Sequence, residues 1–208
     1  MTPDPSARYP IPAREHRAEE VIQKSRFITA LAHAPDAQTA HTVVEAIRAE
    51  FPDATHHCWA FVAGPPGDTA SIGMSDDGEP HGTAGRPMLT TLLHSNVGEI
   101  VAVCTRYYGG TKLGTGGLSR AYSGGVKLAL EGLPTREKVE RVTLTVTVDY
   151  DAVDGLQRLF PGVEGLVEEE DYGERVTFRI SVPEERVSEL KDAVAELTRG
   201  RGEVGSSS

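Results

Sequence analysis

One segment of the chain combines glycines and cations in a pattern that could hold an anion. It runs from Thr105 to Tyr122 and follows an apolar run. We expect a strand, a glycine loop and then a helix, whose first N–H groups have no partner within the helix. Glycine lets the backbone approach a ligand, and the helix dipole adds positive charge, so this segment suits a phosphate or a carboxylate. The predicted anion-binding residues are Arg106, Gly109, Gly110, Lys112, Gly114, Gly116, Gly117 and Arg120.

The charge of this segment differs from that of the whole chain. The formal net charge of the 208 residues is -10, which argues against coating of nucleic acid through bulk positive charge. Residues 100–130 nevertheless carry four cations and no acidic residue. A local RNA site is therefore one interpretation, in which the tyrosines of the segment add stacking. The alternative is that the glycines only form tight turns and the cations are solvated.

A second segment, residues 75–87, is rich in carboxylates and turn residues. Its carboxylates could bind a hard cation or act as acid and base, and its arginine could anchor an anion. The same residue types also cap helices and form turns, so a structural role has equal weight. His57 or His56 could face this loop, where a carboxylate would raise the pKa of the imidazole, but a half-buried histidine with satisfied hydrogen bonds is the favoured interpretation. The possible pocket residues are His57, Asp76, Asp77, Glu79 and Arg86.

The histidines and cysteines do not form a metal-binding pattern. His56, His57 and Cys58 are adjacent, and neighbouring residues on a strand point to opposite faces, so they cannot all bind one ion. We expect no metal and no other cofactor. Cys58 and Cys104 lie in apolar sequence and are expected to be inert core thiols, and two cysteines are too few for a disulfide framework.

Periodicity and composition predict an α+β protein of two domains. Four prolines make residues 1–14 an expected flexible lead-in. A helix-stop signal near residue 134 then divides a first domain, 15–134, from a second domain, 135–204, and residues 205–208 are expected to be a loose tail. The first 134 residues carry a net charge of -3 and the remainder -7.

The expected elements follow from two-residue and helical apolar spacing. In the first domain, the predicted strands are 26–32, 55–63, 69–74 and 99–105. The predicted helices of this domain are 37–51, 85–96 and 116–131. In the second domain, they are strands near 143–150, 163–170, 176–182 and 204, and helices near 153–160 and 187–199. The second set has the order βαββα(β) of a ferredoxin-like domain. The acidic run 168–171 is interpreted as a solvated hairpin loop.

Taken together, the motifs resemble those of the YigZ/IMPACT family, in its bacterial two-domain form. The matching segments span most of residues 20–130. They are Lys24–Phe27, Ala54–Ala60, Ser75–Pro80, Gly82–Met88, Thr105–Tyr107, Gly109–Gly110, Lys112–Gly114, Gly116–Leu118 and Arg120–Tyr122. Tyr108 and Phe61 are mild aromatic exchanges relative to the family pattern, and His81 stands at a variable position.

The resemblance implies a fold and a function. The first domain looks like the βαβ fold of elongation factor G domain IV, and the ferredoxin-like βαββαβ domain looks like domain V of that factor. The implied function is a non-enzymatic RNA- or ribosome-associated binding protein linked to regulation of translation. Eukaryotic relatives bind a kinase activator with an additional N-terminal domain. About 14 residues precede the shared segments here, so we do not expect that interaction.

The sequence is also consistent with two functions other than RNA or ribosome binding. One is an enzyme that acts on a small anionic or phosphorylated substrate in a pocket between the Asp76 and Lys112 loops. The other is an interaction module in which a protein partner binds the acidic second domain. The sequence has no apolar stretch near the roughly 18 residues of a membrane span and no signal-like N-terminus, so we expect a cytoplasmic protein without membrane contact.

Overall fold

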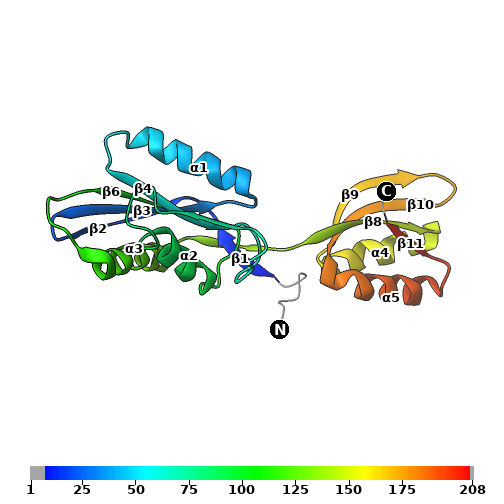
Figure 1. Ribbon diagram of the computed structural model, residues 1–208. Coiled ribbons are helices and arrows are strands. Elements are labelled where there is room, and N and C mark those ends of the chain that lie inside the picture. The colour runs from blue at the N-terminus through cyan, green and yellow to red at the C-terminus, as the bar shows by residue number, and fades with distance from the viewer. Residues whose placement is uncertain (1–7, 207–208) are drawn as a thin grey trace. The chain divides into compact units, whose positions relative to one another are not determined.

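The computed structural model describes residues 8–206 and divides them into two compact units (Figure 1). The first unit comprises Tyr9–Lys138, and the second comprises the described residues from Val139 onward together with Arg8. Both units mix helices with β-sheets, so the predicted two-domain α+β architecture is confirmed. Within residues 8–206, no helix is long and apolar enough to cross a membrane.

The first unit is built on a five-stranded antiparallel sheet with the order β2-β3-β6-β4-β5. Its strands are β2 (His16–Ile22), β3 (Ser25–His33), β4 (His56–Val62), β5 (Ile72–Ser75) and β6 (Ile100–Tyr107). The central strand β6 is buried along almost its whole length, because helices cover both faces of the sheet. This explains why its sequence is a continuous apolar run rather than an alternating one.

One helix covers one face of this sheet and two helices cover the other (Figure 1). On the first face, α1 (Ala37–Glu50) begins where the Asp36 carboxylate accepts a hydrogen bond from the Thr39 N–H at 2.7 Å. On the opposite face lie α2 (Gly85–Leu93) and α3 (Gly114–Glu131), whose apolar residues form a continuous core with β3, β4 and β6. Helix α3 starts two residues before its expected first residue, Gly116.

The ends of the first unit pair with each other, which the sequence did not predict. Strand β1 (Tyr9–Pro12) runs antiparallel to β7 (Thr135–Lys138). Glu99 fixes this pair to the main sheet, since its carboxylate accepts from Tyr9 Oη at 3.2 Å and also pairs with Lys138. Residues 9–12 are therefore not a loose lead-in, and the division between units falls after residue 138 rather than 134; residues 1–7 lie outside the described part of the chain.

The second unit is a four-stranded antiparallel sheet with the order β11-β8-β10-β9 and two helices on one face (Figure 1). Its elements are β8 (Arg141–Val148), α4 (Val153–Leu159), β9 (Leu166–Tyr172), β10 (Val176–Pro183), α5 (Val187–Thr198) and β11 (Glu203–Ser206). Short 3₁₀ turns are η1 (Tyr150–Ala152), η2 (Phe160–Val163) and η3 (Glu184–Arg186). The order βαββαβ agrees with the ferredoxin-like prediction.

Three strands differ from the expectations because their sequences lack a buried apolar face. The acidic run 168–171 lies within β9 and is not a hairpin loop; every residue of this edge strand is exposed. Strand β2 was missed because its pattern is irregular: Glu20 takes one of the half-buried positions, and the apolar Val21 takes an exposed one. Gly205 and Ser206, assigned to a loose tail, pair with β8 as part of β11, whereas residues 207–208 lie outside the described chain.

Candidate functional site

Two loops converge on one pocket of the first unit: the acidic loop, within residues 75–87, and the glycine loop, which joins β6 to α3. The pocket has a volume of about 490 Å³, within the range of small-molecule sites. Its lining comes from the start of β4, the loop before α2, the end of β6 and the first turn of α3. The lining residues are Thr55, His56, Glu79, Pro80, Arg106, Tyr108, Lys112, Leu113, Gly114, Thr115 and Leu118.

Arg106 and Glu79, which both line the pocket, form a buried ion pair. Arg106 is only 5% exposed and Glu79 only 8%, and the Arg106 guanidinium donates to Glu79 Oε1. Tyr122 Oη donates to the same carboxylate oxygen at 2.7 Å, and Arg106 Nη2 lies 3.3 Å from Ser25 Oγ. The guanidinium carbon also lies 5.3 Å from the ring centroid of Phe27 and 5.5 Å from that of Tyr108. Arg106 is therefore a buried cation paired with Glu79 rather than a solvated one, and among the described residues its Nε has no hydrogen-bond partner.

Asp76 is committed to the local fold of the acidic loop. Its carboxylate accepts hydrogen bonds from the backbone N–H groups of Gly82, Ala84 and Gly85 at 2.7, 3.0 and 2.9 Å. Burial disfavours the charged form, but these three donors outweigh it and hold the pKa of Asp76 below its usual value. Asp76 thus supplies the cap that Ala84, at the N-terminus of α2, cannot provide.

Asp77 and His57 also have structural partners. Asp77 accepts from the His57 N–H at 2.6 Å and from Arg48 Nη2 at 3.1 Å. The imidazole of His57 is buried between Thr105 Oγ1 and the Phe51 carbonyl oxygen, each 3.1 Å from a ring nitrogen. Burial lowers the pKa of His57, contrary to the expected rise beside a carboxylate. Neither residue lines the pocket.

The glycine loop owes its shape to close packing and to backbone conformation. A Cβ on Gly109 would lie 2.1 Å from the carbonyl carbon and oxygen of Lys24, so a side chain cannot fit there. Gly110 and Gly114 have φ values of +82° and +72°, which favour glycine. Gly116 and Gly117 lie in the first turn of α3, and neither lines the pocket. Only Gly114 of the predicted glycines contributes to the pocket wall.

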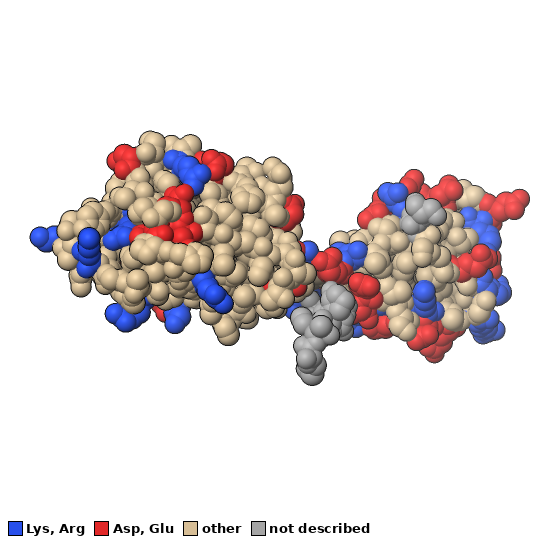
Figure 2. Space-filling model, viewed as in Figure 1, with Lys and Arg blue, Asp and Glu red and all other residues tan. Residues whose placement is uncertain are grey.

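A basic groove lies on the outer side of α2 and α3, apart from the pocket. Arg86 and Arg120 lie in this groove rather than beside the acidic loop, and Lys127 accompanies them. The groove lining contains no carboxylate and includes the hydroxyl residues Thr90, Thr91, Ser119 and Ser123. Figure 2 shows Lys and Arg side chains along the lower side of this unit, where Figure 1 places the two helices. The structure thus separates the predicted cations into two sites.

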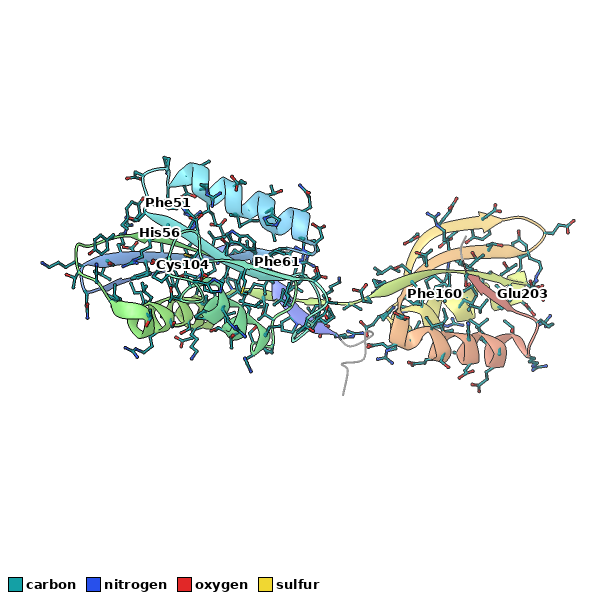
Figure 3. All side chains as sticks on the ribbon, viewed as in Figure 1. Phe51, His56, Phe61, Cys104, Phe160 and Glu203 are labelled. Carbon is teal, nitrogen blue, oxygen red and sulfur yellow. The ribbon has the colours of Figure 1, made fainter. Side chains whose placement is uncertain are left out.

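Several pocket residues were not predicted from the sequence, among them Thr55, Pro80, Tyr108, Leu113, Thr115 and Leu118. His56, rather than its neighbour His57, lines the pocket. Figure 3 labels His56, which is the first residue of β4. Its Nδ1 lies 2.7 Å from the Asp77 carbonyl oxygen, so Nδ1 carries the proton that is donated there. Strand alternation places His56 on the face of β4 that carries Cys58 and Ala60, toward α2 and α3, and His57 on the opposite face with Phe61, toward α1. The sequence separates the two histidines in this way, but it does not say which face carries the pocket.

The cysteines are buried in the sheet and have no chemical role in the pocket. Burial raises the pKa of the Cys104 thiol to about 12, and burial also raises the pKa of Cys58. Both thiols are therefore protonated at neutral pH and poor nucleophiles. Within the described residues, no cluster of three or more His, Cys, Asp or Glu side chains could hold a metal ion.

The fold and the pocket define a class of two-unit α+β proteins, and comparisons with known proteins identify the family. Residues 23–130 match the Impact N-terminal domain, and residues 146–201 match a domain of unknown function, DUF1949. The chain is 47% identical to the Escherichia coli protein described as IMPACT family member YigZ, over 91% of this chain and 93% of that protein. The chain belongs to the IMPACT family.

Other relatives agree with this assignment. The Bacillus subtilis protein described as IMPACT family member YvyE is 35% identical over 92% of this chain and 87% of its own length. A solved structure described as the crystal structure of a hypothetical protein is 45% identical, with a TM-score of 0.69 and coverage of 97% of this chain and 98% of that one. The likeness therefore extends over both units.

Proposed function

We propose that this protein is a non-enzymatic RNA-binding protein, associated with the ribosome or with regulation of translation in the cytoplasm. The basic groove of α2 and α3 carries the proposal, because Arg86, Arg120 and Lys127 lie there without a carboxylate. Cations that are not neutralised by neighbouring acids can bind successive phosphates, and the hydroxyls of the groove can donate to the same oxygens. Because the overall net charge is -10, we expect RNA to bind at this groove and not over the rest of the surface.

A second groove extends this surface along the same two helices. It is lined by Thr90, Thr91, His94, Ser95, Lys127 and Leu130, and it shares three of these residues with the first groove. No acidic side chain lines it. The resemblance to domains IV and V of elongation factor G remains part of this proposal, as a fold analogy that points toward the ribosome.

The alternative is an enzyme that acts on a small anionic substrate in the pocket. Convergence of the acidic and glycine loops, which that function requires, favours it. However, Asp76, Asp77 and His57 are held by backbone or side-chain partners, and Arg86 lies in the groove. Only Glu79 of the five expected pocket residues lines the cavity, and it is already paired with Arg106. We therefore favour binding over catalysis.

The RNA proposal is tested by the salt dependence of binding to a short unstructured single-stranded RNA. The variant is the triple substitution Arg86→Ala, Arg120→Ala and Lys127→Ala. If each cation neutralises one phosphate, the log–log slope of affinity against salt should become shallower by about 2, since each contact to a single strand contributes about 0.7. Affinity at low salt should fall as well.

A matched control removes the same charges elsewhere. The substitutions Arg14→Ala, Arg158→Ala and Lys191→Ala also replace two arginines and one lysine, at exposed positions outside the groove. The control should keep the original slope. An equal loss in both triple variants would indicate non-specific charge attraction and contradict the groove, as would an absence of RNA binding by the unaltered protein at low salt.

A further inference from the structure

The pocket holds positive groups that the fold itself does not use. Helix α3 begins at Gly114 with no side-chain cap and no acidic residue in its first turn. Its first N–H groups therefore lack the capping partner that most helices have, and the helix dipole adds partial positive charge at this point. Lys112 is exposed at the pocket mouth, immediately before this N-terminus.

An unpartnered buried donor lies in the wall of the same pocket. Arg106 is 5% exposed and lines the cavity, yet its Nε has no hydrogen-bond partner among the described residues. A buried donor without an acceptor costs free energy, and an oxygen of a bound ligand could supply the missing acceptor. This observation is independent of the helix N-terminus and points to a ligand with hydrogen-bond acceptors in the same pocket.

The remaining lining suits an organic body rather than a bare ion. Pro80, Leu113 and Leu118 contribute apolar surface, and Tyr108 exposes 47% of its surface while its ring contacts the Arg106 guanidinium. A planar group could stack on such a ring. His56 adds a polar group, since its Nδ1 is held by the Asp77 carbonyl oxygen and Nε2 has no hydrogen bond among the described residues.

The charges of the lining favour an anion despite the presence of Glu79. That carboxylate is buried and already receives hydrogen bonds from Arg106 and Tyr122 through Oε1. With Glu79 paired to Arg106, Lys112 leaves the lining with one net positive charge when His56 is neutral. An incoming phosphate would therefore meet Lys112 and the α3 N–H groups without an opposing free carboxylate.

We propose that this pocket binds a small phosphate monoester with a planar body, of which a nucleoside monophosphate is the simplest example. The phosphate lies at the N-terminus of α3 beside Lys112, and the planar body packs against Tyr108 and Leu113. This site is separate from the basic groove proposed for RNA, because Arg86, Arg120 and Lys127 do not line it.

The proposal is tested by titrating adenosine 5′-monophosphate, adenosine and inorganic phosphate into the full chain, with calorimetry and amide chemical shifts as readouts. The monophosphate should bind more tightly than either part alone, and its shifts should centre on residues 108–118. Thr115→Asp is the decisive variant. It places a carboxylate in the first turn of α3, which favours the helix but repels a bound anion, and should weaken binding about tenfold.

Matched controls separate this site from the groove and from a folding defect. Thr115→Asn has the same shape without the charge and should bind nearly as the unaltered protein does. Lys112→Ala should weaken binding severalfold, whereas Lys127→Ala should have no effect. Equal affinity of Thr115→Asp and Thr115→Asn, equal losses in the two lysine variants, or no shifts near residue 115 would overturn the proposal. The RNA experiment uses other residues, so either proposal can fail alone.

Discussion

Residues 100–130, which contain no acidic residue, supply cations to both the pocket and the basic groove. Arg106 in the pocket and Arg120 in the groove differ in burial, and therefore in role. Arg106 is 5% exposed, paired with Glu79 and in contact with two aromatic rings. Arg120, fourteen residues later on α3, is exposed in a groove without carboxylates. A charge in the core must be compensated inside the protein, whereas a charge in the groove is available to a partner.

The largest expected contrast between the two regions is in stability. Glu79→Ala leaves the Arg106 charge buried without its partner, and should lower the free energy of unfolding by about 3–5 kcal/mol. Arg120→Ala should leave stability nearly unchanged, because that side chain is exposed. Denaturant unfolding followed by fluorescence of Trp59, the single tryptophan, reports on the first unit. Comparable losses in the two variants would contradict the contrast.

A double replacement sharpens this test. Glu79→Leu combined with Arg106→Met removes both charges and retains apolar volume. It should recover much of the stability lost in Glu79→Ala, because the cost of that variant arises from an uncompensated buried charge rather than from a lost attraction. If the double variant is as unstable as Glu79→Ala, packing rather than charge determines the effect.

The next largest contrast concerns two glycines, Gly109 in the glycine loop and Gly116 in the first turn of α3. Gly109→Ala places a Cβ against the Lys24 backbone, which must shift, so we expect a loss of about 1–3 kcal/mol. Gly116→Ala meets only the end of the Arg120 side chain at 3.7 Å and should be neutral or stabilising by up to about 1 kcal/mol. Thermal and denaturant unfolding measure both. A tolerated Gly109→Ala would show that the loop is not fixed by this contact.

A smaller effect depends on pH through Asp76. Its folded-state pKa is depressed, so the ionised carboxylate stabilises the fold above the unfolded value of about 3.9, and this contribution is lost as the pH falls through the folded-state pKa. Asp76→Asn should therefore cost about 1–2 kcal/mol at neutral pH. The difference between the two proteins should shrink below about pH 4. A difference that is constant from neutral to acidic pH would contradict the capping role.

A helix or strand could be predicted from the sequence where its local apolar pattern matches the residues that the fold buries. Helix α1 follows from the Asp36 cap and apolar spacing, and α5 ends at Arg199 and Gly200, both with positive φ. A strand was expected near residues 163–170, but the sequence did not show that the edge strand β9 continues through the acidic run to Tyr172, because no residue in it is buried and its pairing with β10 supplies the order. The strand β1 depends likewise on a partner more than a hundred residues away.

The same division applies to the site. The sequence by itself determined which residue types are present: a glycine loop that leads into a helix, an acidic loop that caps another, and a local excess of cations. The tertiary structure decided that Glu79 meets Arg106, that His56 rather than His57 lines the pocket, and that Arg86 joins Arg120 across two helices. These outcomes depend on strand order and helix packing, which set distances and burial between residues remote in the chain, and no local pattern encodes them.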